Sequence, residues 1–136
     1  MGKAVTRLQS NSVTAHEVNN TIISLVKRIA HEHKRILVVL DSLHTGENVL
    51  KVCAAYGDLV SKDSYLVVMD TVTDMVYGKL ENKELPSHLD RPWNKDDNPM
   101  TGMMKYLENN PQFEYDESFD KLLISSNPRG YLKRIA

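Results

Sequence analysis

The chain has 136 residues, of which 41% are hydrophobic and 26% charged, and its formal net charge is −1. This length predicts a single domain over residues 1–136 with a proper core. So small a net charge gives no electrostatic basis for binding nucleic acid or an anionic membrane. The apolar runs, about five residues long, are far shorter than the roughly 20 residues of a membrane span, and no export signal is evident. We expect a cytoplasmic protein without disulfides, in which the lone Cys53 is a core residue rather than a nucleophile.

The first half of the chain alternates strand and helix patterns. The expected elements are a strand at 4–10, a helix from the Thr14 capping box to His31, a strand at 36–40, a helix from Thr45 to Gly57 and a strand at 65–69. This β-α-β-α-β order predicts an α/β fold with a parallel sheet and right-handed crossovers. Uninterrupted apolar runs at 36–40 and 65–69 are typical of strands covered on both faces. The apolar faces of the two helices are Val18, Ile22, Val26 and Ile29 in the first, and Val49, Val52, Cys53 and Tyr56 in the second.

The second half begins with a long irregular stretch over residues 71–97, and connections of that length are usually functional or disordered. Asn98-Pro99 is a typical helix start, and the helix should end at Asn109-Asn110-Pro111. Its predicted apolar stripe is Met100, Met103, Met104 and Leu107. The segments 121–125 and 131–135 flank a turn at 127–130, which predicts an antiparallel hairpin.

Two acidic residues end the predicted buried strands: Asp41 follows 36–40, and Asp70 follows 65–69. Ligands of open α/β sheets bind outside the carboxyl ends of such strands. Carboxylates converging there suit Mg²⁺, which commonly takes one or two protein carboxylates and completes its shell with water and substrate. The alternative is that each Asp merely caps the helix or turn that follows. No glycine-rich phosphate loop accompanies these strand ends.

Two further features lie near this edge of the predicted sheet. His44, three residues after Asp41, is placed to remove a proton from a substrate hydroxyl, because its pKa lies close to working pH. The alternative is a solvent-exposed loop histidine. Arg91 and Trp93 stand in the long loop, either as part of a lid or as packing that anchors the loop.

Taken in order, several segments resemble the family that contains cephalosporin hydroxylase-type proteins and rhamnosyl O-methyltransferases. The resemblance implies the class I methyltransferase fold, a Rossmann-like sheet with a final antiparallel hairpin. It also implies the use of S-adenosylmethionine, often with Mg²⁺, to methylate hydroxyl groups in lipid or natural-product biosynthesis. The substrate would be a small-molecule or glycolipid hydroxyl. The matching segments are 36–45 (ILVVLDSLHT), 65–71 (YLVVMDT), 91–93 (RPW), 98–101 (NPMT), 113–116 (FEYD) and 127–134 (NPRGYLKR).

Carried over by position, the resemblance implies the following roles. Asp41 matches a metal ligand and, with Ser42, the cofactor-binding segment, while His44 matches the general base. Asp70 matches the second residue of an acidic pair. The first of that pair is Met69 here, and because a thioether is a poor ligand for Mg²⁺, the site is one carboxylate short. The implied substrate-covering loop carries Arg91 and Trp93.

The front of the chain departs from the family pattern, which has two more sheet strands and a glycine-containing cofactor loop. The chain starts at what resembles the third strand, so we expect an N-terminally truncated domain with 36–40 as an open hydrophobic edge. Residues 4–10 or another chain, in a homo-oligomer or as a complementing N-terminal piece, would close that edge. Three functions follow: an O-methyltransferase-like protein, incomplete alone; a non-catalytic remnant or interaction module; or one half of a split enzyme.

Overall fold

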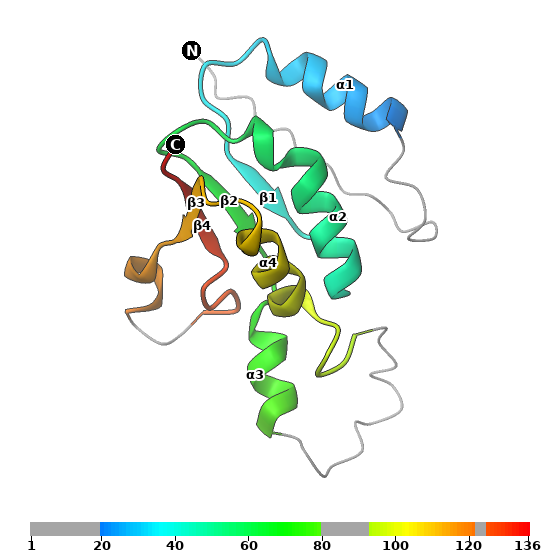
Figure 1. Ribbon diagram of the computed structural model, residues 1–136, viewed down its shortest axis with the longest axis vertical. Coiled ribbons are helices and arrows are strands. Elements are labelled where there is room, and N and C mark those ends of the chain that lie inside the picture. Colours follow the sequence, from blue (N-terminus) through cyan, green and yellow to red (C-terminus); the bar gives the residue numbers. More distant parts are fainter. Residues whose placement is uncertain (1–19, 80–92, 122–124) are drawn as a thin grey trace.

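The computed structural model describes residues 20–79, 93–121 and 125–136, which form one four-stranded sheet with helices beside it (Figure 1). The strands are β1 (Val38–Leu40), β2 (Tyr65–Val68), β3 (Phe113–Tyr115) and β4 (Tyr131–Arg134), in the order β1-β2-β4-β3. The helices are α1 (Asn20–Ala30), α2 (Gly46–Tyr56), α3 (Val72–Lys79) and α4 (Pro99–Glu108). Short 3₁₀ turns follow α2 at Gly57–Leu59 and β3 at Glu117–Asp120. The mixed α/β class predicted from the strand–helix alternation is therefore confirmed.

The predicted parallel pairing of the strands at 36–40 and 65–69 is present, as β1 and β2. β1 pairs with β2 in a register that sets Leu40 opposite Val68, and α2 is the helix in the connection between them. The expectation of cover on both faces is wrong for β1, because the Val39 side chain is 51% exposed. The strand predicted at 4–10 and the Thr14 capping box lie outside the described residues.

The antiparallel part of the sheet differs from the predicted hairpin. β4 pairs antiparallel with β2 on one side and with β3 on the other, so both of its edges are occupied. Its hairpin partner is therefore β3 and not 121–125, most of which lies outside the described residues. With three residues, β3 is too short for alternation of apolar and polar side chains to mark it as a strand.

The core lies between one face of the sheet and helices α2 and α4, which pack against each other. On α2 the predicted face is confirmed, with Val49 and Cys53 buried. On α4, Met103 is fully buried as expected, but Met104 is 41% exposed, and Tyr106 takes the inward position instead. Met103 and Tyr106 are three residues apart and share a face, whereas Met104 is turned by about 100° from Met103. The buried core is Leu40, Val49, Cys53, Val60, Leu66, Val68, Met103, Tyr106, Phe113 and Leu132.

The two core helices begin as predicted and approach closely at their first turns. The Thr45 hydroxyl accepts from the Asn48 amide, and Asn98 forms a capping box with Thr101. Beside these caps, a β-carbon on Gly102 would come within 2.2 Å of the Gly46 carbonyl oxygen. The absence of a side chain at this crossing is what lets α2 and α4 pack backbone to backbone.

Two helices depart from expectation. α1 forms and ends near His31 as predicted, but none of its residues is buried, and Ile22 of its predicted apolar face is 47% exposed. Part of the stretch predicted to be irregular forms α3, whose β-branched and glycine residues have low helix propensity and hide it from the sequence pattern. Among the described residues, no helix has the length and apolar character needed to cross a membrane.

Burial of Cys53 predicts an unreactive thiol. The residue is fully buried in the core, and burial raises the pKa of its thiol to about 12. Because the thiolate is the reactive form, we expect no labelling by a chromogenic disulfide reagent at pH 8 in the folded protein and one equivalent in concentrated guanidinium chloride. Rapid stoichiometric labelling in native buffer would contradict the buried position.

The helix crossing predicts a steric effect of Gly102→Ala. In an open helix the change would stabilise by about 1 kcal/mol through propensity, but here overpacking against Gly46 should destabilise by about 1–3 kcal/mol. Urea unfolding followed by circular dichroism measures the difference. The matched control is Lys105→Ala on the exposed side of α4, expected to change stability by less than about 0.5 kcal/mol. A Gly102→Ala protein as stable as the parent would contradict the close crossing.

Candidate active site

The carboxyl ends of the two parallel strands bring Asp41 and Asp70 to the same edge of the sheet. The Met69 amide donates to the Leu40 carbonyl at 3.0 Å. Backbone hydrogen bonding between the two strands therefore continues to the residues that directly precede Asp41 and Asp70. Both carboxylates are partly open, with Asp41 52% and Asp70 43% exposed. The predicted convergence of the two acidic residues is therefore found.

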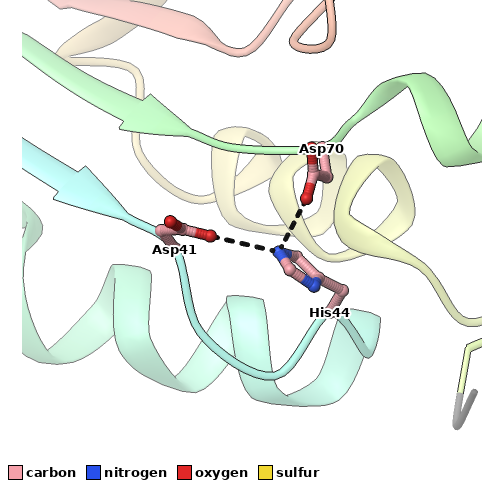
Figure 2. Close-up of side chains that lie close together, drawn as sticks. All are labelled: Asp41, His44 and Asp70. Carbon is pink, nitrogen blue, oxygen red and sulfur yellow. Dashed lines mark ion pairs between the residues drawn. The ribbon is translucent and has the colours of Figure 1, made fainter. Parts of the chain in front are cut away.

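His44 lies between these two carboxylates (Figure 2). Its Nε2 atom is 3.3 Å from Asp70 Oδ2 and 3.7 Å from Asp41 Oδ1. The imidazole is only 17% exposed, and Nε2 is buried without a hydrogen-bond partner. The alternative of a solvent-exposed loop histidine is wrong, because the loop between β1 and α2 turns the ring inward over the sheet edge.

Side chains from α2 hold that loop. Asn48 Nδ2 donates to the Leu43 carbonyl at 2.8 Å and to Ser42 Oγ at 3.0 Å. The hydroxyl oxygen of Ser42, a residue expected to contact the cofactor, thus accepts a hydrogen bond that stabilises the loop.

Asp70 is held from the far side by a residue that the sequence prediction treated only as part of a turn. Asn127, 5% exposed, accepts the Asp70 amide on Oδ1 at 2.7 Å. Asp70 has a φ of 55°, a left-handed conformation uncommon outside glycine, asparagine and aspartate, and this hydrogen bond stabilises it. In the sequence, the only sign of a special role for Asn127 was the Asn-Pro pair at 127–128, and this pair indicated a turn rather than a residue that supports a site.

Trp93 covers the histidine. Its ring meets that of His44 edge-on, with centroids 5.3 Å apart, and the side chain is half-buried. The structure thus brings together Asp41, His44, Asp70 and Trp93, four of the residues predicted for the site. Arg91 lies outside the described residues.

Asp41, His44 and Asp70 each offer one ligand atom, and these atoms lie within 4.8 Å of one another. The two carboxylates are donors of the kind that Mg²⁺ prefers, so they fit that ion in chemistry. Met69 adds nothing to the set, because its sulfur accepts from Asn127 Nδ2 at 3.3 Å. The residues fit Mg²⁺ through two carboxylates rather than three.

The chain thus has a mixed α/β fold with two carboxylates and an imidazole at the carboxyl ends of its parallel strands, the edge at which open α/β sheets bind ligands. The chain belongs to the rhamnosyl O-methyltransferase/CmcI family, whose model matches residues 1–135. No curated protein and no solved structure matches the chain. The family is one of O-methyltransferases, and the resemblance stated from the sequence motifs is confirmed.

The hydrogen bond from Asp70 to Asn127 predicts the effect of Asn127→Ala. Removing the acceptor leaves the Asp70 amide unpaired in a strained left-handed turn, which should cost about 1–3 kcal/mol of stability. Urea unfolding measures it, with Asn109→Ala, an exposed asparagine at the end of α4, as the control. Equal stabilities of the two variants would show that Asn127 does not stabilise the left-handed backbone at Asp70.

Proposed function

We propose that the protein is an S-adenosylmethionine-dependent O-methyltransferase-like protein that acts on a sugar or natural-product hydroxyl. The family match over residues 1–135 supports the reaction class. The observation that carries the proposal for this chain is the position of His44 Nε2 between Asp41 and Asp70 at the sheet edge. A base and two carboxylates side by side are the groups needed to activate an acceptor hydroxyl.

In the proposed reaction His44 accepts the hydroxyl proton on Nε2 while the hydroxyl oxygen attacks the methyl group and S-adenosylhomocysteine leaves. In the site without a bound ion, the flanking carboxylates of Asp41 and Asp70 stabilise the imidazolium that forms. Trp93, packed edge-on against the imidazole, holds the ring in place and limits the access of water. The chain's contribution is thus positioning and charge, with the methyl donor supplying the chemistry of transfer.

Asp41 and Asp70 are the residues that would hold Mg²⁺ in this function. A bound Mg²⁺ would supply positive charge to orient and acidify the acceptor hydroxyl. Because Met69 stands where the family pattern has a carboxylate, we expect this chain to hold Mg²⁺ weakly.

Met69 also favours a second candidate, a non-catalytic member of the same fold that serves as an interaction module. β1 is an edge strand of the described sheet, and Val39 in it and Leu37 just before it are 51% and 55% exposed, which suits such a role as well as pairing with a complementing chain. Cofactor binding separates these candidates, because only a methyltransferase needs it.

The test is titration calorimetry of the full chain with S-adenosylmethionine, with and without Mg²⁺, followed by transfer of a labelled methyl group to a small rhamnoside. We expect weak cofactor binding by the chain alone, and a fall of about 10²- to 10⁴-fold in methyl transfer for His44→Gln as the general base is lost. His33→Gln, in the exposed segment after α1, is the control and should leave transfer unchanged.

Absence of cofactor binding at millimolar concentration would overturn independent methyltransferase activity and favour the interaction module. Binding that appears only with a second polypeptide would favour the split enzyme. Transfer that survives His44→Gln would remove His44 from the role of base.

A further inference from the structure

The orphaned nitrogen of His44 is the feature that Mg²⁺ chemistry leaves unexplained. Nε2 is buried and makes no hydrogen bond, although two carboxylate oxygens lie 3.3 and 3.7 Å away. An N–H group satisfied by one of them would lie at about 2.7–3.2 Å. Nε2 thus contacts both carboxylates, as the dashed lines in Figure 2 mark, without a hydrogen bond to either.

The spacing of these atoms matches a coordination shell. Ligand atoms about 2.1 Å from a tetrahedral metal stand about 3.4 Å apart. The two distances from Nε2 fall on either side of that value, and all three ligand atoms lie within 4.8 Å of one another. Neither Asp41 nor Asp70 is buried, so both carboxylates have room to adjust toward an ion.

The donor set decides which metal this arrangement favours. One imidazole nitrogen with two carboxylate oxygens is a ligand set of Zn²⁺ and its neighbours, which leaves a fourth position for water. Mg²⁺ prefers oxygen donors throughout and gains little from an imidazole. The residue that would add a third carboxylate is Met69, and its sulfur is engaged by Asn127.

We propose that Asp41, His44 and Asp70 together bind Zn²⁺ or a similar borderline cation in preference to Mg²⁺, and that this binding inhibits methyl transfer. The inhibition rests on the proposed function. His44 has one lone pair at Nε2, so an imidazole that ligates a metal cannot accept the proton of the acceptor hydroxyl. The same three residues thus have two states. Without a metal ion, His44 is a base flanked by two carboxylates; with a metal ion bound, all three side chains are its ligands.

Neighbouring residues already hold the ligands in the arrangement that a metal needs. Asn127 secures the backbone of Asp70, Asn48 secures the loop before α2, and the ring of Trp93 abuts that of His44. Such outer contacts orient metal ligands and reduce the ordering that binding requires. The cation site is therefore largely formed before any ion binds.

The experiment uses Co²⁺ as a coloured, paramagnetic probe of the full chain, with Zn²⁺ and Mg²⁺ as competitors. We expect visible absorption bands that saturate at one Co²⁺, displacement by Zn²⁺, and little displacement by millimolar Mg²⁺. The proton NMR spectrum of the Co²⁺ form should hold a far-shifted, exchangeable imidazole N–H resonance. This readout needs no variant and no activity.

Variants then assign the ligand. His44→Ala should lower the Co²⁺ affinity at least about 10-fold and abolish the shifted resonance, since it removes a direct ligand. His31→Ala/His33→Ala, which removes the exposed histidines after α1, should change neither. Met69→Glu adds a carboxylate, so Mg²⁺ should compete with Co²⁺ at a concentration at least about 10-fold lower than in the parent.

An affinity unchanged by His44→Ala, or Mg²⁺ and Co²⁺ competing equally in the parent, would overturn the proposal. Either result leaves the proposed function intact, because cofactor binding and methyl transfer are also measured without added metal. Conversely, Co²⁺ ligation by His44 without cofactor binding would support the metal site while the methyltransferase function fails. Zn²⁺ that binds yet leaves methyl transfer unchanged would overturn the inhibitory role.

Discussion

The parallel pairing of β1 with β2 is the constraint on which both the core and the candidate site depend. Its register sets Leu40 opposite Val68, so these side chains turn toward α2 and α4. The same register ends both strands together, and Asp41 and Asp70 follow at one edge. A shift of one residue in this pairing would reverse the faces of a strand, exposing the core residues and separating the carboxylates.

The C-terminal part of the chain turns this sheet edge into a defined site. β4 inserts antiparallel beside β2, and the turn before it places Asn127 against the backbone of Asp70. Gly130 permits the approach, because a β-carbon there would come within 2.3 Å of the Val68 carbonyl oxygen. This hydrogen bond joins residues that are 57 positions apart in the chain, and it stabilises a left-handed conformation that Asp70 would rarely adopt alone.

Prediction from the sequence succeeded where local chemistry is strong. The Thr45 and Asn98 caps, the parallel strands β1 and β2 and the acidic residues at their ends all carry their signal within a few residues. It failed where the outcome depends on distant partners. The burial of α1 was overestimated, because an apolar stripe shows that a helix can be buried but not what covers it. The hairpin partner of β4 was misassigned for the same reason, since pairing is set by the whole sheet.

By itself, the sequence determined the α/β class, the starts of α2 and α4 and the residue types at the strand ends, because hydrophobic runs and capping groups act on near neighbours. It also carried the family through motifs spread over the chain. Only the tertiary structure decided that the His44 ring turns inward to lie between Asp41 and Asp70, and that Asn127 supports the corner. Such placements depend on loop paths and on contacts between segments far apart in sequence, for which no local pattern exists.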